Sequence, residues 1–145
     1  MEVYTAGFTQ KTAKQFFESL QRVGIRRLLD VQLNNASQLA RISKRDDLGY
    51  FLREICDAEY IHEPLLAPTQ EMFDEYKKRS DRWEEYERCF LALLCEHRVE
   101  EKLDRRLFDV PTVLLCSEAT ADRCHRRLVL EYLQSKWGGM SIVHL

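Results

Sequence analysis

The segment at residues 110–116, VPTVLLC, constrains the fold more than any other part of the chain. It is a short, continuous apolar run, which is typical of a parallel strand covered on both faces. A polar stretch follows, and then residues 119–136, whose apolar side chains recur at the spacing of an amphipathic helix. We therefore expect a buried strand that leads directly into a helix.

Short strands and amphipathic helices alternate along most of the chain. The expected strands lie at residues 3–8, 25–31, 59–62, 110–116 and 140–145. The expected helices lie at residues 9–23, 46–57, 69–78, 82–103 and 119–136. Thr9 and Thr69 are the predicted N-caps of the first and third helices. This alternation predicts the α/β class, with a mostly parallel central sheet of about five short strands flanked by helices in a Rossmann-like, three-layer arrangement.

Length and charge narrow the class of protein. The 145 residues suit a single domain over residues 1–145, with a helical segment at about residues 69–105. Because 22 basic and 24 acidic residues give a net charge of −2, a nucleic acid would have to be bound through a local patch. No signal peptide is recognisable, and no apolar run approaches the roughly 20 residues of a membrane helix. We therefore expect an intracellular, cytoplasmic protein without a membrane partner, of undetermined oligomeric state.

The turn after the apolar strand gathers the residues with the richest chemistry. Cys116 ends the strand, and a helix starting near Thr120 would direct its N-terminal N–H groups at the thiol and lower the pKa of Cys116. At helical spacing, Cys124 and His125 share the inward face of that helix. Cys116 is thus a candidate nucleophile or substrate contact. An inert packed thiol, a redox pair with Cys124 and metal ligation are the alternatives.

The cysteine pattern limits these alternatives. The five cysteines follow no disulfide framework, so we expect reduced thiols. The spacing Cys-x7-Cys-His matches no zinc motif, and we predict no metal and no other cofactor. The remaining cysteines, Cys56, Cys89 and Cys95, are expected to pack on helix faces.

Polar side chains in other loops extend the candidate site, because ligands of open α/β sheets bind at the carboxyl ends of the strands. The predicted catalytic residues are Cys116 as nucleophile, His125 as general acid–base and Glu118 as orienting carboxylate. The predicted substrate-binding residues are Asp30, Asn35, Ser37, His62, Cys124 and Arg126. Arg126 would bind a substrate anion beside the helix N-terminus. For each of these residues a structural role stays open: a hydrogen-bonded turn, a buried histidine or a surface charge.

Several segments resemble, in order, the family named domain of unknown function 488: VYTAGFT, LLDVQ, DLGYFLREICDAEYIHEPLLAP, LLCSEATADRCHRRLV and IVHL. The most specific element is similar to that family's cysteine–x–glutamate and cysteine–histidine–arginine signature. Its positions are occupied by Cys116, Glu118, Cys124, His125 and Arg126. The resemblance implies a small α/β domain of prokaryotic origin with a functional pocket near the signature. Gln32 stands where the family usually has arginine, and the loop at residues 34–39, NNASQL, marks a subgroup.

Three functions compete at this point. The leading hypothesis is an enzyme of undetermined reaction, whose pocket at the strand ends is built around Cys116, Glu118, His125 and Arg126 and takes a nucleotide, nucleic acid or other anionic substrate. The first alternative is a non-catalytic nucleic-acid or nucleotide-binding module that uses basic side chains. The second is a protein-interaction domain that presents an aromatic patch around Trp83, although core packing is the simpler interpretation of those aromatic residues.

Overall fold

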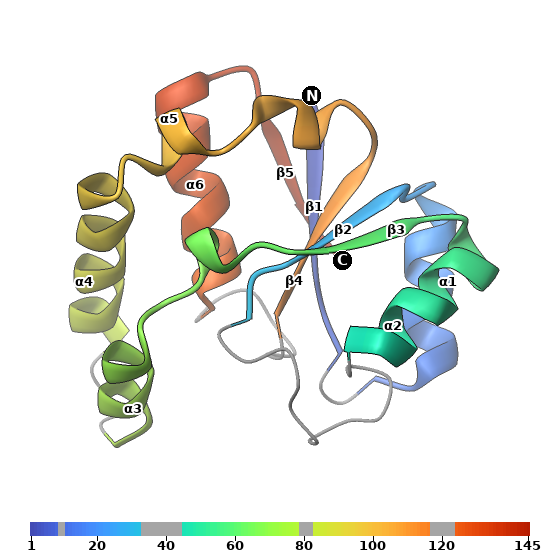
Figure 1. The fold of residues 1–145 in the computed structure, drawn as a ribbon, viewed down its shortest axis with the longest axis horizontal. Helices are drawn as coiled ribbons and strands as arrows, with labels where there is room; N and C mark the ends of the chain where they lie inside the picture. Colours follow the sequence, from blue (N-terminus) through green and yellow to red (C-terminus); the bar gives the residue numbers. More distant parts are fainter. Residues whose placement is uncertain (9–10, 33–44, 79–82, 117–123) are drawn as a thin grey trace.

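A computed structural model of the protein describes residues 1–8, 11–32, 45–78, 83–116 and 124–145 (Figure 1). The strands are β1 Glu2–Gly7, β2 Arg27–Asp30, β3 Glu59–His62, β4 Thr112–Cys116 and β5 Ser141–His144. The helices are α1 Ala13–Arg22, α2 Arg45–Phe51, α3 Gln70–Lys78, α4 Trp83–Glu96, α5 Val99–Lys102 and α6 His125–Trp137. A π-helical turn at Leu52–Cys56 extends α2, and 3-10 turns lie at Pro64–Leu66 and Arg105–Phe108.

The five strands form one parallel sheet in the order β3-β2-β4-β1-β5. β4 is the central strand, and its five residues are all buried. Leu114 lies opposite Leu29 of β2 and Thr5 of β1, and Cys116 lies opposite Gly7. The continuous apolar run of β4 is thus explained by neighbours on both edges and cover on both faces.

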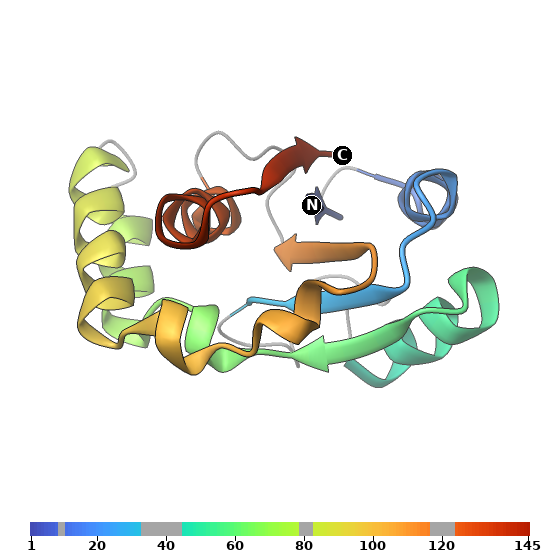
Figure 2. The same ribbon diagram turned by 90° about the horizontal axis from the view of Figure 1, so that it is seen from above.

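Helices cover both faces of the sheet and create two apolar cores. α3, α4, α5 and α6 lie on one side, and α1 and α2 lie on the other (Figure 2). Successive residues of β4 alternate between the two cores: Leu114 and Cys116 face α4 and α6, whereas Val113 and Leu115 face α1 and α2. The predicted three-layer α/β fold with a parallel five-stranded sheet is confirmed. Within the described part of the chain, no helix combines the length and the apolar character that crossing a membrane requires.

Two helix starts show how local capping sets the boundaries. α1 begins at Ala13, because Thr12 and Gln15 form a reciprocal capping box in which each side chain accepts a hydrogen bond from the other residue's backbone N–H. The prediction that Thr9 caps this helix is therefore wrong. Thr69 does cap α3 as predicted, since its Oγ1 accepts a hydrogen bond from the N–H of Met72 at 3.1 Å.

The predicted helix at residues 82–103 is divided in the structure. α4 ends at Glu96, Arg98 adopts the left-handed conformation with φ of 49°, and α5 starts again at Val99. The break turns the chain so that Val99 and Leu103 are buried beside α6. Neither glycine nor proline marks the break in the sequence, which explains why helical periodicity concealed it.

The break at Arg98 yields a stability test. Arg98→Gly should stabilise the protein by about 0.5 to 1 kcal/mol, because glycine adopts positive φ without a Cβ clash. The exposed ion pair between Arg98 and Glu101, with an N–O distance of 3.9 Å, contributes little in opposition. The matched change Arg88→Gly, at an exposed position inside α4, should destabilise by about 1 kcal/mol. Urea denaturation measures both, and destabilisation by both changes would indicate an unbroken helix.

Candidate functional site

The carboxyl ends of β2 and β4 form a topological switch point. β2 leads to α2 on one face of the sheet, whereas β4 leads to α6 on the opposite face. In open α/β sheets, ligands bind beside such a point, where the connections from two adjacent strands lead to opposite faces. Val31 and Gln32, which follow β2, therefore lie at the same edge of the sheet as Cys116.

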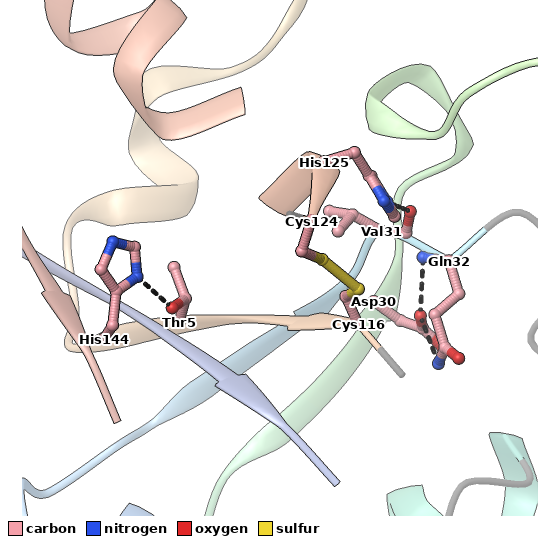
Figure 3. The surroundings of a disulfide bond; sticks show 8 residues. All are labelled: Thr5, Asp30, Val31, Gln32, Cys116, Cys124, His125 and His144. Atoms are coloured by element: carbon pink, nitrogen blue, oxygen red, sulfur yellow. Dashed lines mark hydrogen bonds between the residues drawn. A yellow bond between two sulfur atoms is a disulfide. The ribbon is translucent and has the colours of Figure 1, made fainter. Parts of the chain in front are cut away.

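Cys116 and Cys124 form a disulfide at this switch point (Figure 3). Cys116 is the last residue of β4, Cys124 is the N-cap of α6, and their Cα atoms are 7.5 Å apart. Each cysteine is only 2% exposed. Of the sequence interpretations, the redox pair is the one this pairing matches, and the expectation that all cysteines are reduced thiols is wrong for these two.

His125 is the first residue of α6, because the helix starts there and not near Thr120 as predicted. Its Nε2 lies 2.6 Å from the carbonyl oxygen of Val31, just beyond β2. A carbonyl only accepts hydrogen bonds, so Nε2 carries the proton and Nδ1 keeps its lone pair. The imidazole edge packs against the ring of Phe90 of α4, with 5.6 Å between the ring centroids.

The electrostatic surroundings keep His125 neutral near pH 7. Burial is the main cause that lowers the pKa of His125 to about 4, and the charge of Arg126 lowers it further. The hydrogen bond to Val31 acts in the opposite direction and raises the pKa. A neutral imidazole with a free Nδ1 can accept a proton or ligate a metal ion, and a ring nitrogen lies within 4.8 Å of both sulfur atoms.

Arg126, the second residue of α6, brings a positive charge into the same region. It is 1% exposed, although arginine is among the residues least often buried. The pKa of Lys11 is lowered mainly by burial and secondarily by the charge of Arg126, which indicates that the two cations lie near one another. Lys11 Nζ also donates to the carbonyl oxygen of Leu145 at 3.4 Å. Together with the positive end of the α6 dipole, these charges favour an anion near the helix start.

Asp30 belongs to a separate hydrogen-bonded group on the other face of the sheet. Its Oδ1 accepts from the backbone N–H and from Nε2 of Gln32, both at 3.0 Å, and its Oδ2 accepts from the hydroxyl of Tyr60. Asp30 is fully buried, and its register partner is Leu115, not Cys116. Its carboxylate therefore serves to shape the end of β2 and does not converge on the sulfur atoms.

His62 approaches the same segment from β3. Its Nε2 donates to the carbonyl oxygen of Gln32 at 3.1 Å, so His62 of β3 and His125 of α6 bind two consecutive carbonyls, those of Gln32 and Val31. Sequence reasoning singled out both histidines. The involvement of backbone carbonyls and of Tyr60 was missed, because these contacts depend on strand order and register, which no local pattern reveals.

The remaining candidates have different outcomes. Glu118, Asn35 and Ser37 lie outside the described residues. Cys56 is half-buried, burial raises its thiol pKa, and it packs as predicted. Cys89 and Cys95 are exposed on α4, so the prediction that they pack on a helix face is wrong.

A family model described as a domain of unknown function, DUF488, matches residues 12–133. The chain belongs to the DUF488 family. The matched span includes β4, the start of α6 and the residues Val31, Cys116, Cys124, His125 and Arg126. No significant match was found among curated proteins or among solved structures.

The lowered pKa of His125 predicts a pH-dependent stability for this DUF488 protein. Between about pH 6.5 and 4 the unfolded chain binds a proton at His125 that the folded chain does not, so the free energy of unfolding falls as the pH falls. The pKa difference sets an upper limit of about 3.4 kcal/mol for this loss. The actual loss should be smaller, because the residue is partly accessible to solvent. His125→Gln keeps a donor for Val31 and removes the titration.

Urea denaturation at pH 4.5 and 7 measures this effect. We expect the wild-type protein to lose more stability than His125→Gln between the two pH values. Equal losses in the two proteins would show that His125 is not held neutral by the fold.

Proposed function

We propose that this protein is a cysteine-dependent enzyme that acts, in its reduced form, on an anionic substrate at the carboxyl ends of β2 and β4. The substrate class best suited to the charges is one that carries a phosphate group, such as a nucleotide or nucleic acid. The observation that carries the proposal is the convergence of Cys116, Cys124 and neutral His125 within 4.8 Å at the switch point.

The charges near the helix start support the choice of an anion. Arg126 is the second residue of α6, a helix of 13 residues whose dipole is positive at this end, and its charge also acts on Lys11. An incoming phosphate would therefore meet positively charged groups at this end of α6. The same positive field would stabilise the thiolate form of Cys116 after reduction.

The proposed reaction begins with reduction of the disulfide. An external dithiol supplies two electrons and two protons and is itself oxidised to a disulfide, which leaves two thiols at Cys116 and Cys124. His125 Nδ1 then accepts the proton of the Cys116 thiol, and the neighbouring thiolate raises the pKa of His125 as the ion pair forms.

Nucleophilic attack follows at the electrophilic atom of the substrate. The thiolate electron pair of Cys116 forms the new bond, and the leaving group departs with the electron pair of the broken bond and takes the proton from His125. Water then displaces Cys116 from the intermediate and restores the thiol. Arg126 binds the substrate anion throughout.

The described residues favour the alternative functions less. Arg127, which a nucleic-acid module would use for phosphates, lies over the ring of Trp83 and pairs with Glu87 at 3.6 Å and Glu131 at 3.4 Å. Trp83 itself is 6% exposed and packs with Tyr76 of α3, so core packing is confirmed for this aromatic residue and an exposed interaction patch is not supported.

The test uses reduced full-length protein with three substrate classes: nucleotides, single- and double-stranded nucleic acids, and simple phosphomonoesters. Cys116→Ser should lower the rate of turnover by about 10³-fold or more, because a hydroxyl is a far weaker nucleophile than a thiolate. Cys89→Ser, the matched change at an exposed cysteine, should leave turnover unchanged. In parallel, the rate at which iodoacetamide alkylates reduced Cys116 should reach half its maximum below the pH of about 8.5 expected for a free cysteine, a midpoint that does not depend on how exposed the thiol is.

Two results would overturn the proposal. The first is turnover that survives Cys116→Ser. The second is the absence of turnover on all three classes together with an alkylation midpoint of Cys116 at or above about pH 8.5.

A further inference from the structure

We infer that Cys116, Cys124 and His125 form, once the disulfide is reduced, a binding site for a single thiophilic divalent metal ion of the zinc class. The inference goes beyond the proposed enzyme activity and does not depend on it. It starts from one spatial fact: the two sulfur atoms and a ring nitrogen of His125 all lie within 4.8 Å of one another.

The spacing of the three atoms suits a tetrahedral ion. With metal–sulfur bonds of about 2.3 Å and metal–nitrogen bonds of about 2.0 to 2.1 Å, ligand atoms around zinc are about 3.5 to 3.8 Å apart. Reduction releases the sulfur atoms of Cys116 and Cys124 from their bond, and a small separation of the two side chains brings them to this distance. The backbone already holds the ligands together, because β4 ends at one cysteine and α6 begins at the other.

The hydrogen bond from His125 to Val31 prepares the imidazole for metal binding. Nε2 donates to the backbone carbonyl at 2.6 Å, which leaves Nδ1 as the nitrogen with a lone pair. Histidines that bind metal ions usually donate their other N–H to a carbonyl or carboxylate, which fixes both the tautomer and the ring orientation. The contact with Phe90 restricts the ring further.

The ligand chemistry selects the ion. Two thiolates and one imidazole favour zinc and other thiophilic ions over magnesium or calcium, which prefer oxygen ligands. Two thiolate charges neutralise the divalent ion, so the centre adds no net charge beside the buried Arg126. Three protein ligands leave a fourth position for water or another ligand, as in catalytic zinc sites.

The proposed site differs from the zinc motifs on which the prediction of no metal was based. Known zinc motifs place pairs of ligands at short, fixed spacings along the chain. The ligands proposed here come from the end of a strand and the start of a helix. Sequence spacing between Cys116 and Cys124 therefore says little about the distance between their sulfur atoms. Only the fold brings them together with His125.

Metal binding and disulfide formation are alternative states of the same two sulfur atoms. Reduction by an external dithiol supplies two electrons and two protons, and binding of the ion then releases the two thiol protons to solvent. An ion bound at Cys116 also occupies the proposed nucleophile, so the metal-bound enzyme should be inactive in the reaction proposed above.

The experiment titrates cobalt(II), as a spectroscopic probe for zinc, into full-length protein that has been stripped of metal and reduced under anaerobic conditions. We expect a thiolate-to-cobalt charge-transfer band that saturates at one ion per chain and disappears when zinc is added. The band should be lost in Cys116→Ser, Cys124→Ser and His125→Asn. It should persist in Cys95→Ser and His97→Asn, the matched changes at an exposed cysteine and an exposed histidine of the same chain.

A second measurement does not require any variant to fold. Zinc should protect Cys116 and Cys124 of the reduced wild-type protein from alkylation and leave the exposed Cys89 reactive, as mass spectrometry of the peptides would show. The inference is overturned if the reduced wild-type protein develops no charge-transfer band, or if zinc protects neither Cys116 nor Cys124.

Failure of this inference is distinguishable from failure of the proposed function. Loss of turnover in metal-free Cys116→Ser, combined with no cobalt band in the wild type, would leave the enzyme proposal standing and exclude the metal site. A cobalt band combined with turnover that survives Cys116→Ser would support the metal site and exclude the proposed enzyme mechanism.

Discussion

Burial of β4 on both faces is the constraint on which the rest of this structure depends. The strand lies between β1 and β2, and Leu114 packs under α6 while Leu115 packs toward α1. Burying a leucine side chain contributes roughly 1.5 to 3 kcal/mol. If β4 lay at an edge of the sheet, its side chains would be less buried and the protein would lose much of this stabilisation. With β4 in the centre, its last residue, Cys116, necessarily arrives at the switch point beside the end of β2. His125 then joins α6 to β2 through Val31, so one strand position determines the neighbours of the candidate site.

The parts of the fold governed by local chemistry could be predicted from the sequence. The apolar run of β4, the cap at Thr69 and the burial of Trp83 each follow from side chains within a few residues. The capping box of Thr12 and Gln15 was equally available, because a threonine followed three residues later by glutamine is a recognised helix-start pattern.

The parts that depend on contacts across the chain could not be predicted in this way. The start of α6 was misplaced because Cys124 is not a typical N-cap, whereas Thr120 is. The pairing of Tyr60 with Asp30 requires knowing that β3 lies beside β2 in a particular register. Cys116 could be a nucleophile, a redox partner or a metal ligand, and the choice depends on where the sulfur atom of Cys124 lies. The number of residues between two cysteines does not reveal the distance between their sulfur atoms.

The central claim is that the fold brings Cys116 and Cys124 together and keeps the other cysteines apart. Its most direct test is to reduce the folded protein, oxidise it gently with a thiol oxidant, block the remaining thiols and map the linked peptides by mass spectrometry. The account predicts that the peptides of Cys116 and Cys124 are joined and that Cys56, Cys89 and Cys95 are recovered as blocked thiols. A mixture of linkages, or Cys116 and Cys124 recovered unlinked, would contradict it.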